Sequence, residues 1–182
     1  NKFYINGEWI EPSGRPTLDV INPATEEAFA TISMGTADDV DAAAQAARAA
    51  FPAWSQSNLE ERKTVIQKIM AGIQARSAEL ATAISNEMGA PMSLATAAQV
   101  PSGLGHFAAI LPVLDSFQFQ ETRGSTLIVK EAAGVCGFIT PWNWPLNQIA
   151  CKVAPALAAG CTIVLKPSEV APINAYILAE II

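Results

Sequence analysis

Two strand-like apolar runs with a helix-like run between them form the clearest pattern in the chain. The first, Gly134 to Thr140, is closed by Pro141, and the second, Cys161 to Leu165, is rich in β-branched residues. Leu146 to Ala159 has the apolar character of a buried helix and is followed by Gly160, a common helix stop. Parallel strands need such a crossover, which is right-handed in nearly all proteins. The pattern therefore predicts two adjacent parallel strands joined by a helix.

The first part of the chain is predicted to form β ribbons. Phe3 to Ile5 and Glu8 to Ile10 flank Asn6-Gly7, a two-residue turn that favours a hairpin because both residues tolerate positive φ. Two further strand-like stretches follow, Leu18 to Ile21 and Ala28 to Ile32. We expect these ribbons to lie over the sheet, at its edges.

Helical patterns occupy the middle of the chain. The first begins at Thr36, a capping residue followed by acids, and is predicted to end at Pro52. Ser57 to Glu60 has the form of a capping box for the second, which restarts near Ser77 and ends at Gly89. The apolar residues of this second segment keep helical spacing, which is typical of a core-facing stripe rather than a ligand site: Ile66, Ile69, Met70, Ile73, Leu80, Ile84 and Met88.

A third helical segment and another ribbon complete the pattern. Met92 to Leu114 is predicted to be helical, with breaks near its two prolines. Phe117 to Thr122 and Ser125 to Glu131 then alternate around Arg123-Gly124, which favours a second hairpin.

Composition and charge narrow the function to small-molecule chemistry. The chain has 182 residues, 51% of them hydrophobic, and a net charge of −6 with no basic cluster. This balance argues against nucleic acid and against anionic membrane surfaces. The first residues have no apolar signal core, and we expect His106, Pro112, Lys152 and Pro155 to interrupt the later apolar segments before they reach bilayer length. We therefore expect a cytoplasmic protein with no membrane partner.

The three cysteines have no paired spacing, so the sequence predicts neither a disulfide framework nor a metal site. Cys136 and Cys161 lie in predicted strands and Cys151 in the predicted helix, where a thiol usually acts as a small hydrophobe. His106, the one histidine, is expected to be a packed or solvated helix residue rather than a catalytic one.

Three motifs in the last quarter of the chain resemble the aldehyde dehydrogenase superfamily, in order and in spacing. They are Pro141-Trp-Asn-Trp-Pro145, Lys152-Val-Ala-Pro-Ala-Leu-Ala-Ala-Gly160 and Leu165-Lys-Pro-Ser-Glu169. In that family the asparagine amide helps to bind the oxyanion that forms when a cysteine attacks the aldehyde. The lysine and the glutamate contact the adenosine ribose of the cofactor. The resemblance implies these roles for Asn143, Lys166 and Glu169, with NAD as the cofactor and NADP as the alternative.

The remaining cofactor-binding candidates lie beside these residues, because ligands of open α/β sheets collect beyond the carboxyl ends of the strands. The full predicted set is Ile139, Thr140, Pro141, Trp142, Lys166, Ser168 and Glu169, with Asn143 as the catalytic residue and no metal ligand. The residues alone leave two alternatives open. Asn143 has the place of a helix cap, and Lys166 with Glu169 could be a solvated surface pair.

The resemblance implies a fold class, a domain division and a reaction. The fold class is α/β, an incomplete Rossmann-like parallel sheet with surrounding helices and with N-terminal and bridging β ribbons. Residues 1–116 are expected to supply ribbons and helices of the cofactor-binding domain. Residues 117–133 are expected to form the ribbon of an arm that bridges subunits, and residues 134–182 the first βαβ unit of the NAD(P)-binding domain. The parent protein is expected to be a homodimer or homotetramer.

The expected reaction is oxidation of an aldehyde to a carboxylic acid through a cysteine thiohemiacetal. In the family the nucleophilic cysteine, the general-base glutamate and the glycine-rich loop all follow the lysine at a distance. The chain ends in an apolar helical pattern without a stop signal, so we expect the N-terminal portion of such an enzyme, inactive alone. The alternatives are an inert cofactor-binding or assembly fragment, and a relative that acts on activated acids.

Overall fold

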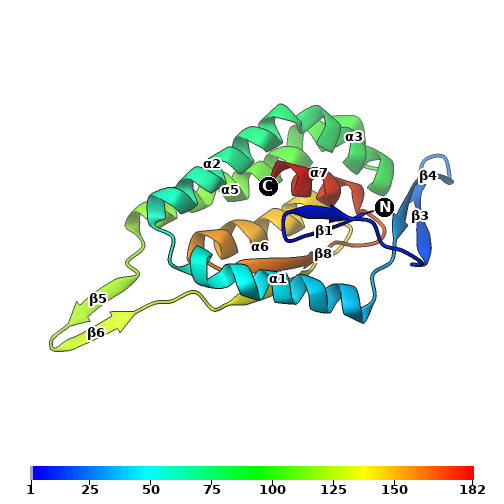
Figure 1. Ribbon diagram of the computed structural model, residues 1–182. Helices are drawn as coiled ribbons and strands as arrows, with labels where there is room; N and C mark the ends of the chain where they lie inside the picture. The colour runs from blue at the N-terminus through cyan, green and yellow to red at the C-terminus, as the bar shows by residue number, and fades with distance from the viewer. Residues whose placement is uncertain (1) are drawn as a thin grey trace.

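A pair of parallel strands lies at the centre of the structure, a computed structural model that describes residues 2–182 (Figure 1). Strand β7 (Val135–Ile139) pairs with β8 (Thr162–Lys166) over their whole lengths. Helix α6 (Pro145–Ala159) connects them and ends at Gly160, whose φ of 87° suits a residue without a side chain. The predicted parallel pairing and helical crossover are confirmed.

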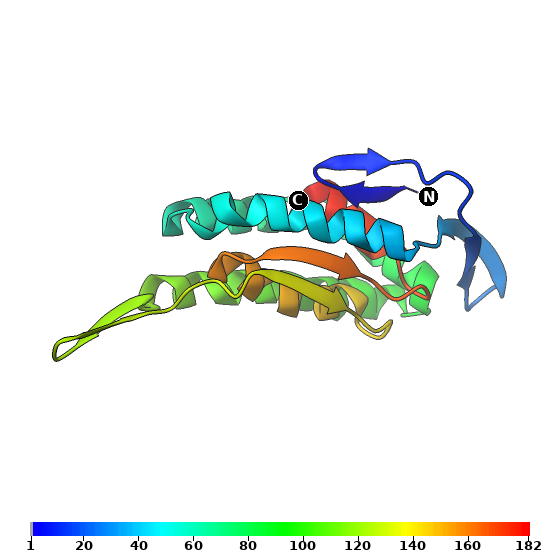
Figure 2. The same ribbon diagram turned by 60° about the horizontal axis from the view of Figure 1, so that its bottom comes forward.

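Helices cover both faces of this strand pair. Figure 2 shows α1 (Ala37–Ser55) on one side of the strands and α6 with α5 (Val100–Ser116) on the other. The Thr162 hydroxyl donates to the Ala47 carbonyl at 2.8 Å, which ties β8 to α1. The result is three layers, helix, sheet and helix, the arrangement typical of parallel sheets in α/β proteins.

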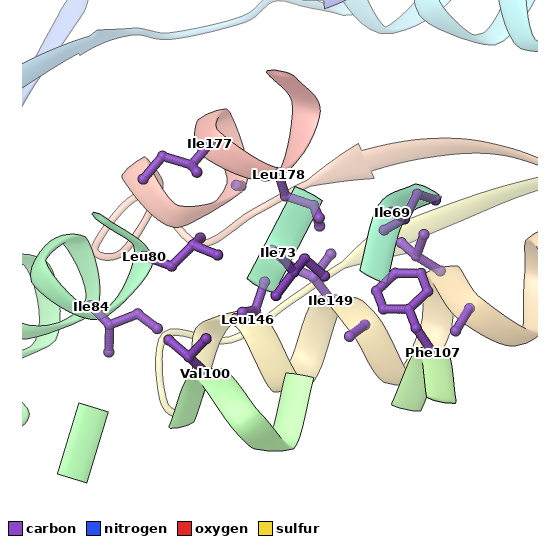
Figure 3. Packing of buried hydrophobic residues seen from close by; sticks show 14 of the residues in the cluster. Ile69, Ile73, Leu80, Ile84, Val100, Phe107, Leu146, Ile149, Ile177 and Leu178 are labelled. Atoms are coloured by element: carbon purple, nitrogen blue, oxygen red, sulfur yellow. The ribbon is translucent and has the colours of Figure 1, made fainter. Parts of the chain in front are cut away.

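The hydrophobic core lies on the α6 side, among α5, α6 and three more helices. These are α2 (Leu59–Ala75), α3 (Ser77–Met88) and α7 (Ile173–Ile181). Figure 3 shows their apolar side chains meeting around Ile73 and Ile149. The predicted apolar stripe is part of this core: Ile66, Ile69, Ile73, Leu80 and Ile84 are buried, and Met70 and Met88 pack against it.

The β ribbons form separate two-stranded sheets. In the first, β1 (Phe3–Ile5) pairs with β2 (Glu8–Ile10) around Asn6-Gly7, and both turn residues have positive φ as expected. This ribbon lies against helices rather than over the parallel sheet, because Trp9 stacks on Tyr176 of α7 at 5.8 Å. The expectation that it covers the sheet is therefore wrong.

The other two ribbons are also antiparallel hairpins. Strand β3 (Thr17–Asn22) pairs with β4 (Glu27–Ser33), and β5 (Gln120–Arg123) pairs with β6 (Thr126–Val129). The turn between β5 and β6 is Gly124-Ser125, one residue later than predicted. Figure 1 shows this ribbon projecting away from the body of the chain.

Two helix boundaries differ from the prediction. The cap of α2 is Asn58 rather than Ser57: its side chain accepts from the Glu61 N–H at 2.9 Å, and the Glu61 carboxylate accepts from the Asn58 N–H at 2.8 Å. Helix α1 continues through Pro52 to Ser55. A proline removes one hydrogen bond and kinks a helix, and near its end this does not stop the helix.

The segment Met92–Ser116 is one continuous helical run rather than a broken one. It consists of α4 (Met92–Leu94), a π-helical turn η1 (Ala95–Gln99) and α5. The π turn lies just before Pro101, which lacks the N–H that an intrahelical hydrogen bond needs. This run of 25 residues is long and apolar enough to cross a membrane by length and composition, so the expected interruptions are wrong here. The inner side of α5 packs against α6, and 28% of the most apolar stretch is buried.

Close approach of α5 to α6 depends on a glycine. A Cβ built at Gly103 would lie 2.6 Å from Cγ of Leu146, which is fully buried in the first turn of α6. At Gly105, two residues further along α5, a Cβ would meet nothing within 4 Å. Gly103 is therefore required by packing, whereas Gly105 is not.

These two glycines allow a matched test of the helix packing. We expect Gly103→Ala to destabilise the full-length protein by about 1 to 3 kcal/mol through overpacking. Gly105→Ala should stabilise it by roughly 0.5 to 1 kcal/mol, because alanine favours the helix. Thermal unfolding of the wild type and both variants measures the effects. Melting temperatures that rise in both variants would contradict the packing of α5 on α6.

Candidate active and cofactor site

The loops that follow β7 and β8 start side by side. The last pair of the parallel ladder is Ile139 with Lys166, and the Thr140 N–H donates to the Lys166 carbonyl at 3.2 Å, one step beyond β7. The segment 140–144 and the loop 167–172 therefore leave the sheet at the same edge. This edge is the carboxyl end of both strands, where ligands of open α/β sheets bind.

The first loop places apolar surface and one amide at this edge. Ile139 is 80% exposed and Trp142 is 50% exposed, whereas Thr140 is buried. Trp144 has a φ of 56°, a left-handed conformation that costs a bulky residue about 1 to 2 kcal/mol. Such strain persists only where the surroundings impose it, and it often marks a functional site.

The structure excludes one of the two roles considered for Asn143. The cap of α6 is Trp144, whose carbonyl accepts from the Gln148 N–H at 2.9 Å, and no side chain caps this helix end. The alternative that Asn143 caps the helix is therefore wrong. Asn143 is exposed, and its amide makes no hydrogen bond to any residue from 2 to 182. The amide is free to donate to a bound molecule.

The second loop carries an ion pair. Nζ of Lys166 lies 2.5 Å from Oε2 of Glu169, and both side chains are about half exposed. The hydrogen bond from Lys166 lowers the pKa of the Glu169 carboxyl below its usual range. An exposed pair contributes little to stability, so each partner can exchange the other for a ligand at small cost. The geometry is equally that of a solvated surface pair, and that alternative stays open.

Ser168 has a different place from its neighbours. It is buried, its hydroxyl accepts from the Val170 N–H at 3.3 Å, and its carbonyl accepts from the Ala171 N–H at 3.2 Å. These bonds shape the loop from within. The other predicted cofactor residues lie at the edge described above: Ile139, Thr140, Pro141, Trp142, Lys166 and Glu169.

A polar cluster on α6 was not among the predicted site residues. Nζ of Lys152 donates to the carbonyl of Gln148 at 3.0 Å and lies 3.6 Å from Sγ of Cys151. His106 of α5 is half-buried, with its Nε2 3.0 Å from the Asn147 amide nitrogen in the first turn of α6. Polar residues at helical spacing after Asn143 were the signal that could have revealed this cluster.

The three cysteines are free thiols, and Cys161 is buried. Burial raises the pKa of the Cys136 thiol, which weakens it as a nucleophile. Within residues 2–182, no group of three or more acidic, histidine or cysteine side chains is arranged to hold a metal ion.

The family of the chain follows from its comparison with known proteins. The model of the aldehyde dehydrogenase family matches residues 9–182. The chain belongs to the aldehyde dehydrogenase family. The resemblance inferred from the motifs around Asn143 and Lys166 is confirmed.

The chain spans about 38% of the length of the curated aldehyde dehydrogenases that it matches. A 3-succinoylsemialdehyde-pyridine dehydrogenase of a Pseudomonas species is 52% identical over 181 residues, which are 99% of this chain and 38% of that protein. A putative aldehyde dehydrogenase of Staphylococcus epidermidis is 49% identical over 180 residues, again 38% of its length. The chain therefore corresponds to an N-terminal portion of its relatives, as expected.

Solved aldehyde dehydrogenase structures match the fold closely. Aldehyde dehydrogenase C of Pseudomonas syringae, a mutant crystallised with NAD+ and octanal, has a TM-score of 0.97 and 51% identity over 99% of this chain and 37% of its own. An aldehyde dehydrogenase of Bartonella henselae has a TM-score of 0.95 and 47% identity over 99% of this chain and 39% of its own. The expected α/β fold class with an incomplete Rossmann-like sheet is confirmed.

The position of Asn143 predicts that its removal does not weaken the fold. We expect Asn143→Ala to leave the melting temperature of the full-length protein nearly unchanged, because the side chain caps nothing. The matched control is Asn58→Ala, which removes the cap of α2 and should cost about 1 kcal/mol. Equal losses of melting temperature in the two variants would contradict the observation that the Asn143 amide has no hydrogen-bond partner within residues 2–182.

Proposed function

We propose that the full-length protein is an NAD-dependent dehydrogenase that oxidises a small-molecule aldehyde to a carboxylic acid, with NADP as a second acceptor. Membership of the aldehyde dehydrogenase family supports this reaction class. The observation that carries it is the exposed Asn143 amide, which has no partner within residues 2–182 and follows the strand whose end meets Lys166.

In this proposal Asn143 acts on the oxygen of the aldehyde. When a thiolate attacks the carbonyl carbon, the electron pair of the C=O bond moves to oxygen, which becomes negative. The amide N–H of Asn143 donates to that oxygen. The two prolines and the strained Trp144 hold the loop, so the donor does not reorganise during the reaction. The three thiols of this chain are not proposed as the nucleophile.

The residues at the strand ends fit an adenosine ribose. Glu169 presents a carboxylate that can accept hydrogen bonds from both ribose hydroxyls, and Lys166 presents an ammonium that can donate to a hydroxyl or a phosphate. Ile139 and Trp142 offer exposed apolar surface, and Thr140, Pro141 and Ser168 shape the two loops. No Gly-x-Gly-x-x-Gly turn follows β7, so the pyrophosphate is not assigned to this turn. NAD, when bound, accepts the hydride.

We also propose a cytoplasmic homo-oligomer, a dimer or a tetramer, with neither nucleic acid nor a membrane as a partner. The projecting β5–β6 ribbon supports assembly, because Leu127 and Val129 are exposed on it. Three free thiols fit a reducing compartment. The net charge of −6 disfavours nucleic acid and anionic lipid. The division of the chain into residues 1–116, 117–133 and 134–182, described above, is also part of this proposal.

The direct test is an assay of the purified full-length protein. With octanal as the aldehyde, we expect NADH to form in proportion to the acid produced, without coenzyme A or phosphate. Activity that requires coenzyme A or phosphate would instead indicate a relative that acts on activated acids. A full-length protein that binds NAD but oxidises none of a panel of aliphatic and aromatic aldehydes would contradict the proposal.

The role of Asn143 predicts a specific kinetic defect. Asn143→Ala in the full-length protein should lower kcat by about 10² to 10³, the usual loss for one oxyanion donor. The dissociation constant for NAD should change little, because the residue does not contact the ribose. Steady-state kinetics and a binding titration measure the two effects. Near-normal turnover would refute the catalytic assignment.

The Lys166–Glu169 pair predicts the choice between cofactors. Glu169→Gln should lower the NAD to NADP ratio of kcat/KM by roughly tenfold, because it weakens the bond to the ribose hydroxyl and relieves repulsion of the extra phosphate. Lys166→Ala should raise the ratio, because NADP loses an ammonium partner. Glu60→Gln is the control, since this exposed acid pairs with Lys63 on α2. An unchanged ratio in all variants would leave a solvated surface pair as the correct description.

A further inference from the structure

A buried carboxylate on α3 has no role in the site described so far. Glu87 is 1% exposed and is the one buried acidic side chain among residues 2–182. Its Oε2 accepts from the Ile173 N–H at 2.5 Å. Its Oε1 accepts from the Asn174 N–H at 3.2 Å and from Nδ2 of Asn174 at 2.5 Å. Glu87 therefore caps the first turn of α7, where the helix's own cap position is Pro172, which offers no side-chain acceptor.

Burying a charged carboxylate at this place costs free energy. The geometry of its hydrogen bonds explains why a neutral amide does not replace it. Burial raises the pKa of Glu87 to about 7, although the bonds from Asn174 and Ile173 act in the opposite direction. A glutamine has nearly the same shape and avoids the charge. The Nε2 of a glutamine, however, would face the Ile173 N–H, so that two hydrogen-bond donors would point at each other. Only a carboxylate accepts hydrogen bonds at both oxygens, as the start of α7 requires.

The start of α7 is also the end of the loop that carries Glu169. Nδ2 of Asn174 donates to the Ala171 carbonyl at 2.9 Å as well as to Glu87. The Ala171 N–H in turn donates to the Ser168 carbonyl at 3.2 Å. A continuous series of hydrogen bonds thus leads from the buried carboxylate to the residue just before Glu169.

We propose that Glu87 is a positioning residue of the cofactor site, which fixes the loop between β8 and α7 so that Glu169 and Lys166 meet the ribose. Glu87 does not touch the cofactor, because it is buried against the first turn of α7. It acts through Asn174 and Ala171. The inference rests on the proposed function, since it takes Glu169 as the ribose ligand.

The test uses Glu87→Gln in the full-length protein. We expect KM and the dissociation constant for NAD to rise about tenfold, the effect of one lost charge-assisted hydrogen bond, while kcat stays within about twofold. The control is Glu79→Gln, the same substitution on the same helix, at an exposed acid that bonds Arg76. This control should leave both constants unchanged.

A double-mutant cycle separates positioning from general stability. If Glu87 acts through Glu169, adding Glu87→Gln to Glu169→Gln should raise KM for NAD little further. Effects that simply multiply would overturn the proposal, as would a lower melting temperature with unchanged KM. If Glu87→Gln does not fold, Asn174→Ser decides, because it keeps the backbone bonds to Glu87 and removes the bridge to Ala171. An unchanged KM for NAD in that variant also overturns the proposal. A wild type without NAD-dependent aldehyde oxidation would instead contradict the proposed function.

Discussion

The parallel pairing of β7 with β8 dictates how the surrounding helices pack. Two parallel strands need a crossover, and α6 can return along the sheet only if it packs against one face. That face is then closed by α5, which approaches α6 at Gly103. The other face is covered by α1. The same pairing brings the ends of both strands to one edge, so that the loops with Asn143 and Glu169 begin side by side.

Two buried charged side chains connect the surrounding helices to the β7–α6–β8 unit. Arg62 lies near the end of α6, and Glu87 lies at the start of α7. Arg62 of α2 donates to the Ala158 carbonyl at 3.1 Å, near the end of α6, and to the Ser55 carbonyl at 2.9 Å, at the end of α1. A cation at helix ends of this polarity is favourable, although burial lowers the pKa of the guanidinium. A Cβ at Gly160 would lie 2.7 Å from this group, so a side chain there would displace the guanidinium, and the φ of 87° also favours glycine. Glu87 is the counterpart, an anion at the start of α7.

In the candidate site the backbone is restrained, whereas the side chains proposed to bind ligands have few hydrogen-bond partners. Trp144 and its neighbouring prolines restrain the backbone at Asn143, yet the amide has no partner among residues 2–182. Lys166 and Glu169 form an ion pair in which both side chains are about half exposed. Groups that are positioned by the backbone and left without strong partners can bind a ligand without first breaking costly bonds. The geometry therefore agrees with the family relationship.

Local sequence patterns were enough to predict the strand, helix and strand unit, the Asn6-Gly7 hairpin and the motifs that carry Asn143, Lys166 and Glu169. These depend on apolar periodicity, turn chemistry and short-range order, which act over a few neighbouring residues. Three other features became visible only in the folded chain: Pro52 stays inside a helix, Ser168 is buried, and Glu87 caps a helix 86 residues away. The physical reason is that burial and hydrogen-bond partners are set by segments far apart in the chain, so no local pattern records them.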